Sequence, residues 1–186
     1  MIYNSAGHHN NDSGAVATHN GIKYQENIIM KEFRGLINNR LDSKGYKYIN
    51  DNDNETLSQY LTRIKSGTGS VIFEGHLNAF VTSIATGIEI IIPTNHSQAE
   101  YKIASMMAQG LHKITGLALR NGGTGVITEG QSKRGSLAIM KKPGINILAE
   151  FGFISNSNDL KILQDKKVEI CNFVGDCLIL AEDWFS

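Results

Sequence analysis

Two histidines of this sequence stand at the exits of short apolar runs, where folded proteins often hold ligands. His8 follows the run at residues 2–6, and His76 ends the segment that begins Val71-Ile72-Phe73. If both runs are strands of one open sheet, both imidazoles lie at its carboxyl edge, where ligands bind. Imidazole is a common metal ligand. Each histidine also has an ordinary interpretation, His8 as a solvated loop residue and His76 as a hydrogen-bonded core residue.

Glu26 occupies a position that is unusual for a charged side chain. It precedes Ile29 by three residues and Phe33 by seven, so it lies on the apolar stripe of a predicted helix. Burying an unpaired carboxylate is unfavourable, and a bound metal would offset that penalty. The alternative is an acidic residue in the first helical turn, which the helix dipole favours.

Glu150 closes a segment with the pattern of a buried strand, residues 145–151 (INILAEF). A carboxyl group in such apolar surroundings has a raised pKa unless a cation is near. Groups of this kind serve as general acids and bases. Glu150 is therefore the candidate for proton transfer.

Two imidazoles and one carboxylate form a ligand set of the catalytic zinc type, which leaves one position open for water. His8 and Glu26 are 18 positions apart, and His76 comes 50 positions later. Spacings of that length do not form a motif by themselves, and the HExxH pattern is absent. The residue types allow a metal hydrolase without selecting one.

Alternating apolar runs and helical patterns predict an α/β fold. We expect residues 1–186 to form a single domain with a central, mostly parallel, twisted sheet of about six strands flanked by helices. The predicted strands are residues 2–6, 46–49, 71–76, 87–92, 136–140 and 145–151. The predicted helices are residues 22–41, a helix beginning near Glu55, residues 95–115 and residues 159–184. Loops are predicted at residues 7–21 and 116–135.

The composition argues against some classes of protein. Lys and Arg total 18, as do Asp and Glu, so the formal net charge is zero. A general nucleic-acid-binding protein would normally be basic. No segment approaches the roughly 20 apolar residues of a membrane-spanning helix. The N-terminus shows neither the basic region nor the apolar run of a signal peptide. We therefore expect a protein made in the cytoplasm without a signal peptide, with no membrane span and no nucleic-acid partner.

Four segments match, in order and at compatible spacing, the pattern of one enzyme family. Residues 6–15 (AGHHNNDSGA) are similar to its opening glycine–histidine loop, and Glu26 falls at its glutamate ligand. Residues 75–79 (GHLNA) are similar to its strand-end histidine segment, and residues 148–156 (LAEFGFISN) to its catalytic-glutamate signature. The chain thus resembles the zinc-dependent N-acetylmuramoyl-L-alanine amidases of bacterial cell walls and phage endolysins.

The resemblance implies one zinc ion held by His8, Glu26 and His76, with Glu150 as the catalytic residue, in an amidase/zinc-carboxypeptidase-like fold. It favours His8 over the neighbouring His9 as a ligand. The implied reaction is hydrolysis of the amide between N-acetylmuramic acid and L-alanine in peptidoglycan. A zinc peptidase acting on another cell-wall amide and a non-catalytic wall-binding relative are the alternatives. We expect such a protein to reach the wall after holin-type or lysis-linked release.

Three further residues are candidates for substrate binding. Asn78 and Asn156 flank the predicted site and could bind the peptide, or hold a loop by backbone hydrogen bonds. Arg134 precedes a predicted strand and could receive a substrate carboxylate, or be solvated. The chain also departs from the family at Glu74-Gly75, directly before His76, where a small polar or aliphatic residue is usual. We expect this change to alter the pocket and to keep the ligand.

Overall fold

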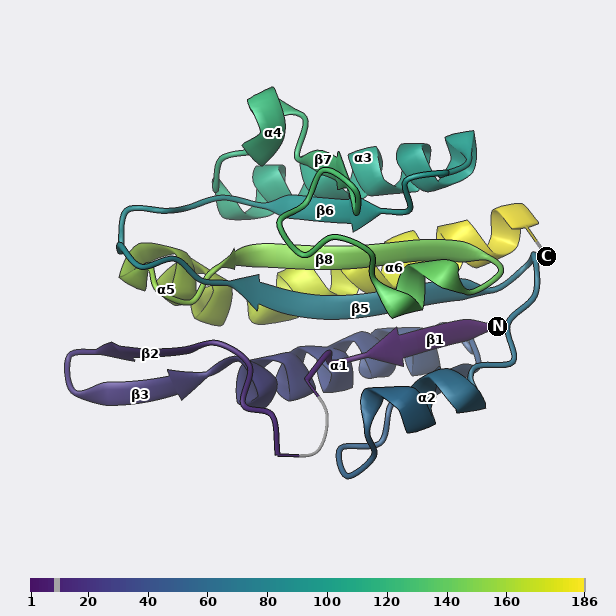
Figure 1. The fold of residues 1–186 in the computed structure, drawn as a ribbon, viewed down its shortest axis with the longest axis horizontal. Helices are drawn as coiled ribbons and strands as arrows, with labels where there is room; N and C mark the ends of the chain where they lie inside the picture. The colour runs from purple at the N-terminus through teal and green to yellow at the C-terminus, as the bar shows by residue number, and fades with distance from the viewer. Residues whose placement is uncertain (9–10, 186) are drawn as a thin grey trace.

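A six-stranded sheet forms the centre of the computed structural model, which describes residues 1–8 and 11–185 (Figure 1). In spatial order the strands are β4 (Tyr48–Asn50), β1 (Ile2–Ser5), β5 (Val71–Asn78), β8 (Ile145–Phe153), β6 (Glu89–Ile92) and β7 (Val126–Thr128). Only the β6–β8 pair is antiparallel among these strands, and the other neighbouring pairs are parallel. The predicted mostly parallel sheet flanked by helices is confirmed.

Three long helices pack side by side on one face of the sheet (Figure 1). They are α1 (Glu26–Ser43), α6 (Lys167–Phe185) and α3 (Gln98–Thr115). The shorter α5 (Ser157–Asp165) follows β8 and packs against it. Among the described residues, the helices on the opposite face are α2 (Leu57–Arg63) and the 3-10 helix η1 (Ala138–Lys141). In the part of the chain that is described, no helix is both long and apolar enough to cross a lipid bilayer.

The alternation of side chains along β5 and β8 decides which face carries the polar site. Phe73 of β5 belongs to the large core under the three helices. Its neighbour Ile72 and Leu148 of β8 belong to the smaller core on the opposite face, beneath α2 and η1. Side chains two residues apart in a strand share a face. His76 therefore continues the face of Ile72, and Glu150 that of Leu148, so both lie on the thinly covered side.

The prediction of an uninterrupted loop at residues 7–21 and of a helix beginning at residue 22 was wrong. Residues 16–25 form a hairpin of β2 (Val16–His19) and β3 (Ile22–Gln25), and α1 begins only at Glu26. The turn consists of Asn20 and Gly21, with φ angles of 53° and 79°. An Asn-Gly pair is the preferred two-residue hairpin turn because both residues tolerate positive φ. Turn chemistry here overrides helical periodicity.

Three further expectations differ from the structure. The predicted strand at residues 136–140 is wrong, because η1 occupies this segment while β4 and β7 already fill both edges of the sheet. The predicted loop at residues 116–135 contains β7 and the short turn α4 (Arg120–Gly123). The single predicted C-terminal helix is divided at Lys166, since α5 packs on β8 and α6 packs on α1 and α3. The other predicted elements are present with shifted ends.

Asp159 fastens the end of β8 to the segment that leads into β6. This fully buried carboxylate accepts hydrogen bonds from the backbone N–H of Phe153 at 3.0 Å and of Gly87 at 3.2 Å. It also accepts the hydroxyl of Thr86. Since Phe153 lies three residues beyond Glu150, these bonds fix the strand that carries the candidate catalytic group.

Replacing Asp159 with alanine is expected to lower the free energy of unfolding by about 3 kcal/mol, because two buried backbone N–H groups and the hydroxyl of Thr86 lose a charged acceptor. Urea denaturation of the purified variant measures the change. Asp165→Ala is the matched control, since this exposed carboxylate at the end of the same helix pairs only with Lys161 among the described residues. Its free energy of unfolding should change by less than about 0.5 kcal/mol. Equal losses in the two variants would contradict the assigned role of Asp159.

Candidate active site

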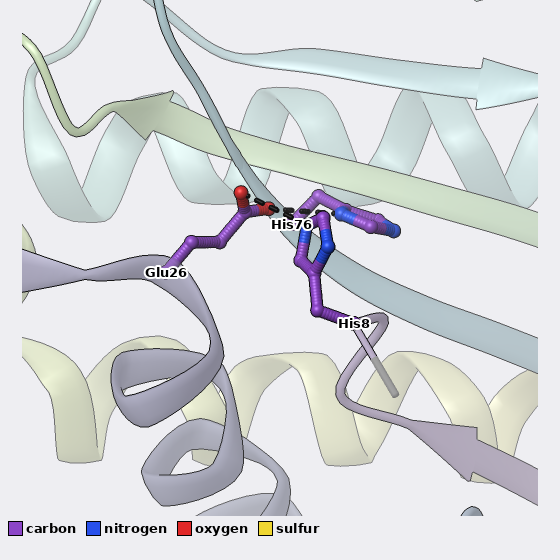
Figure 2. A group of neighbouring side chains, drawn as sticks. All are labelled: His8, Glu26 and His76. Carbon is purple, nitrogen blue, oxygen red and sulfur yellow. Dashed lines mark hydrogen bonds and ion pairs between the residues drawn. The ribbon is translucent and has the colours of Figure 1, made fainter. Parts of the chain in front are cut away.

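His8, Glu26 and His76 converge at the carboxyl ends of β1 and β5, as predicted (Figure 2). His8 lies in the loop after β1, Glu26 begins α1, and His76 lies in β5. One ligand atom from each residue lies within 4.8 Å of the others. Glu26 stands between the histidines, with Oε1 2.9 Å from Nδ1 of His76 and Oε2 2.9 Å from Nε2 of His8. The two rings are nearly perpendicular, at an interplanar angle of 85°.

Backbone amides hold the Glu26 carboxylate in place from two sides. The N–H of Leu77, next to His76 in β5, donates to Oε1 at 2.9 Å. The N–H of Ala15, just before the hairpin, donates to Oε2 at 2.7 Å. Glu26 is only 1% exposed. Each oxygen thus meets one amide and one imidazole, so its position is fixed before any ligand binds.

Two glycines bring the loop after β1 against the ligand side chains. Gly7 has a φ of 73°, and a Cβ built on it would lie 2.6 Å from Cε1 of His76. Gly14 has a φ of 64°, and its Cβ would lie 2.5 Å from Cδ2 of His8 and 2.6 Å from Oε2 of Glu26. Such distances exclude a side chain, and positive φ favours glycine independently. The loop can enclose the ligand set only with glycine at both positions.

A buried ion pair fixes α1 relative to β1. Arg34 of α1 donates to Oδ1 of Asp51 at 2.7 Å and to Oδ1 of Asp53 at 2.8 Å. Asp51 in turn accepts the backbone N–H of Ala6, two residues before His8. The helix that begins with Glu26 and the strand that leads to His8 are therefore tied together about two helical turns beyond the ligands.

The histidines and carboxylates of the cluster shift one another's pKa values toward the charged forms. Burial raises the pKa of Glu26, but its contacts with His76 and His8 outweigh burial and hold that pKa well below its usual range. Burial would lower the pKa of His76, yet the carboxylates of Glu26 and Glu74 raise it to about 10. The pKa of His8 is raised despite burial, through Glu26 and Asp12. An ionised carboxylate between two imidazoles is the result.

This donor set fits a zinc ion. Catalytic zinc sites use three protein ligands of the imidazole and carboxylate types. The buried Nε2 of His8 has no hydrogen-bond partner of good geometry, although it lies 2.9 Å from Oε2 of Glu26. Two ligand atoms that face each other in this way, without a well-formed hydrogen bond, are suited to share a cation. His9, the alternative to His8, lies outside the described residues.

Glu150 lies on β8 directly opposite His76 of β5. Its side chain is 1% exposed, and burial raises its pKa, against the opposing charges of His76 and Arg134. Nη2 of Arg134 lies 2.8 Å from Oε1 of Glu150. Oε2 is buried and has no hydrogen-bond partner among the described residues. The predicted candidate for proton transfer thus adjoins the ligand set and keeps one oxygen available.

Two cavities open at the site and share Arg134. The first, of about 540 Å³, is lined by His8, His76 and Glu74 together with apolar residues of α2 and η1. The second, of about 610 Å³, is lined by Glu150 and by residues around β6. Because Arg134 borders both and pairs with Glu150, it stands where the cavities meet. A long substrate could extend to either side of the ligand set.

The two asparagines proposed for substrate binding have different surroundings. Asn78, the last residue of β5, lines the second cavity. Asn156 caps α5, where Oδ1 accepts the N–H groups of Asn158 and Asp159, and Nδ2 donates to the carbonyl of Ala85. The loop-holding alternative therefore accounts for the hydrogen bonds of Asn156. Its binding role stays a prediction.

The sequence reasoning missed two carboxylates that contact the ligand histidines. Oδ2 of Asp12 lies 2.9 Å from Nδ1 of His8, and Oε1 of Glu74 lies 2.8 Å from Nε2 of His76. The signal for Glu74 was present, because a residue two positions before His76 in a strand must share its face. Glu74 had been noted only as a departure from the family pattern.

Comparisons with known proteins identify the family and agree with the fold. A model of the N-acetylmuramoyl-L-alanine amidase family matches residues 2–173. A structure from Neisseria meningitidis, assigned as an N-acetylmuramoyl-L-alanine amidase, is 25% identical with a TM-score of 0.74, over 96% of this chain and 93% of that one. An N-acetylmuramoyl-L-alanine amidase of Clostridium difficile 630 is 16% identical with a TM-score of 0.78, over 98% and 96%.

The catalytic domain of an endolysin targeting Clostridia difficile is 18% identical with a TM-score of 0.69, over 96% of each chain. At this identity, and at that of the Clostridium difficile 630 enzyme, the likeness establishes the fold alone. A comparison with curated proteins finds no match. The family match extends over nearly the whole chain and includes the ligand cluster and Glu150. The chain therefore belongs to the N-acetylmuramoyl-L-alanine amidase family.

Proposed function

We propose that this protein is a zinc-dependent hydrolase of the amide between N-acetylmuramic acid and L-alanine in peptidoglycan. One zinc ion is held by His8, Glu26 and His76, and Glu150 carries the proton. The observation that carries the proposal is the buried cluster whose ligand atoms lie within 4.8 Å of one another, beside a buried carboxylate with an available oxygen. Family membership supports the choice of peptidoglycan as substrate.

The residues of the site divide the chemical work between them. A zinc ion in such a site supplies Lewis acidity, which polarises a carbonyl and makes water a nucleophile near pH 7. Glu150 accepts the proton of the attacking water at Oε2 and passes it to the nitrogen of the leaving L-alanine. Burial raises the pKa of Glu150, so it accepts a proton more readily than an ordinary carboxylate, and the leaving amine nitrogen is a stronger base to which it can pass that proton.

Arg134 and Asn78 are the residues that we assign to substrate binding. Arg134 borders both cavities, and Asn78 borders the second. A guanidinium group binds a carboxylate through paired, charge-assisted hydrogen bonds. When a carboxylate of the stem peptide binds the guanidinium of Arg134, Glu150 loses its ion pair and its pKa rises, which makes it a stronger proton acceptor. Recognition of the peptide would then be linked to the readiness of the base.

The remaining part of the proposal concerns delivery. A cell-wall substrate requires the protein to reach the wall, and we propose holin-type or lysis-linked release, as described for phage lysins. The likeness to an endolysin catalytic domain is one of fold and is compatible with that route.

Digestion of purified peptidoglycan should release intact stem peptides that begin with a free L-alanine amine, and leave N-acetylmuramic acid with a free lactyl carboxylate. Mass spectrometry of the products, with zinc analysis of the same preparation, tests both parts of the proposal. We expect one zinc ion per chain. Cleavage within the stem peptide would identify a peptidase instead, and wall binding without any cleavage would identify a non-catalytic relative.

Replacing Glu150 with glutamine should reduce kcat by about 10²–10⁴-fold while one zinc ion per chain is retained, because the amide cannot relay a proton. His8→Ala and His76→Ala should instead lose the metal, measured by elemental analysis after dialysis. Glu100→Gln serves as the control, since this buried glutamate binds the backbone N–H of Asn146 at the other end of β8. Full turnover by the Glu150 variant would exclude the assigned role.

Arg134→Gln should raise KM for a soluble muramyl peptide about tenfold, since the stem peptide loses a charge-assisted contact. Arg134→Lys should recover part of the affinity, because lysine keeps the charge without the paired geometry. Steady-state kinetics measure both variants. Arg40→Gln is the control, because Arg40 pairs with Asp176 of α6 on the helical face of the molecule. An unchanged KM in Arg134→Gln would rule out this contact with the substrate.

A further inference from the structure

We propose that the carboxylate of Glu74 is a positioning residue for the metal centre: it accepts the N–H of His76 at Nε2 and thereby directs Nδ1 of that ring to the metal. The inference rests on the proposed zinc site and concerns a residue that the family pattern does not share. It assigns to Glu74 a hydrogen bond to a ligand rather than a place among the ligands.

With a metal bound, the geometry around His76 leaves one consistent proton arrangement. Nδ1 lies 2.9 Å from Oε1 of Glu26, and Nε2 lies 2.8 Å from Oε1 of Glu74. An imidazole that binds a metal is neutral, so it has one nitrogen for the metal and one N–H to donate. Glu26 belongs to the ligand cluster, and Glu74 does not, among the residues that the structure describes. The N–H must therefore point to Glu74.

The strand places Glu74 for this task. Glu74 and His76 lie two positions apart in β5, on the face opposite the helices, and Gly75 between them points to the other side. Glu74 is 7% exposed and adjoins Leu148 of β8 in the sheet register. A buried carboxylate in contact with apolar residues is stable only where donors meet it. The N–H of His76 is one such donor, and the strand fixes both side chains.

His8 also has a carboxylate at each ring nitrogen, but the roles of its two nitrogens are exchanged relative to His76. Oδ2 of Asp12 lies 2.9 Å from Nδ1 of His8, while Nε2 of His8 faces Glu26. His8 therefore presents Nε2 to the shared centre, and His76 presents Nδ1. The Asp12 side chain is 63% exposed, against 10% for Glu74, so water competes for the first contact far more than for the second.

Carboxylate partners of this kind orient a metal-bound imidazole and make it a stronger ligand, and their loss typically weakens metal affinity by about 10–100-fold. Glu74→Gln preserves the shape of the side chain but removes its charge, so its affinity for zinc should fall by about tenfold. Glu74→Ala removes the acceptor altogether, so the zinc affinity of this variant should fall by at least the same factor. Both substitutions leave His8, Glu26 and His76 unchanged.

The experiment measures the zinc dissociation constant of the metal-free protein by competition with a chromophoric chelator. The matched control is Glu89→Gln. Glu89 is also a buried glutamate and lines the second cavity, but it pairs with Arg120 and Asn121 instead of a histidine. Its zinc affinity should equal that of the wild type. The absorption spectrum of the cobalt-substituted protein should change in Glu74→Gln and not in Glu89→Gln, since it reports the ligand geometry directly.

The outcomes separate this inference from the proposed function. A wild-type protein that binds no zinc overturns both. A wild-type protein that binds zinc, with an equal dissociation constant in Glu74→Gln, overturns the role of Glu74 and leaves the zinc site intact. A purely structural role would lower the melting temperature of the metal-free variant without changing the zinc affinity of its folded fraction, which also counts against the inference. Weaker binding in a folded Glu74→Gln supports it.

Discussion

The buried carboxylate of Glu26 is the constraint on which the site depends. An ionised group with 1% exposure is stable only if its surroundings supply donors for both oxygens. Those donors come from two segments that are far apart in the sequence: the loop after β1, with His8 and the N–H of Ala15, and the end of β5, with His76 and the N–H of Leu77. The chain must bring these segments together to bury the first turn of α1. The core around the first turn of α1 can therefore form only when the site residues are also in place.

The thin covering of one sheet face explains where chemistry can occur. The helical face is filled by the large core under α1, α3 and α6, and a polar side chain there needs a partner on a helix, as Asn4 has in Asn38 of α1. In the part of the chain that the structure describes, α2 and η1 are the helices on the opposite face, and the smaller core ends at Ile72 and Leu148. Beyond those residues the same face continues as Glu74, His76 and Glu150. The alternation of side chains along β5 and β8 therefore directs the apolar residues of the large core to one face of the sheet and the polar residues of the candidate site to the other.

Much of this arrangement could be predicted because it follows from local periodicity. The strand before His8, the strand that carries His76 and the apolar stripe that includes Glu26 are visible in the sequence and are present in the structure, although β5 continues to Asn78. Periodicity could not reveal the β2–β3 hairpin, which depends on the turn at Asn20 and Gly21.

Nor could periodicity reveal that residues 138–141 form a 3-10 helix, because that depends on which strands already occupy the sheet edges. The pairing of Arg134 with Glu150 and of Glu74 with His76 joins side chains whose orientation only the folded chain defines. Family resemblance, rather than spacing, selected His8 over its neighbour.

The contacts between the carboxylates and the two histidines have a consequence for the metal-free protein. Protons can occupy the place of the ion, because the pKa of His76 is raised to about 10 and that of His8 is raised as well. The protonated histidines and the carboxylates that contact them then neutralise each other. In the zinc enzyme that we propose, metal binding is then an exchange of protons for a cation at side chains whose positions are already fixed. Under that proposal, the chain folds before it binds its zinc ion.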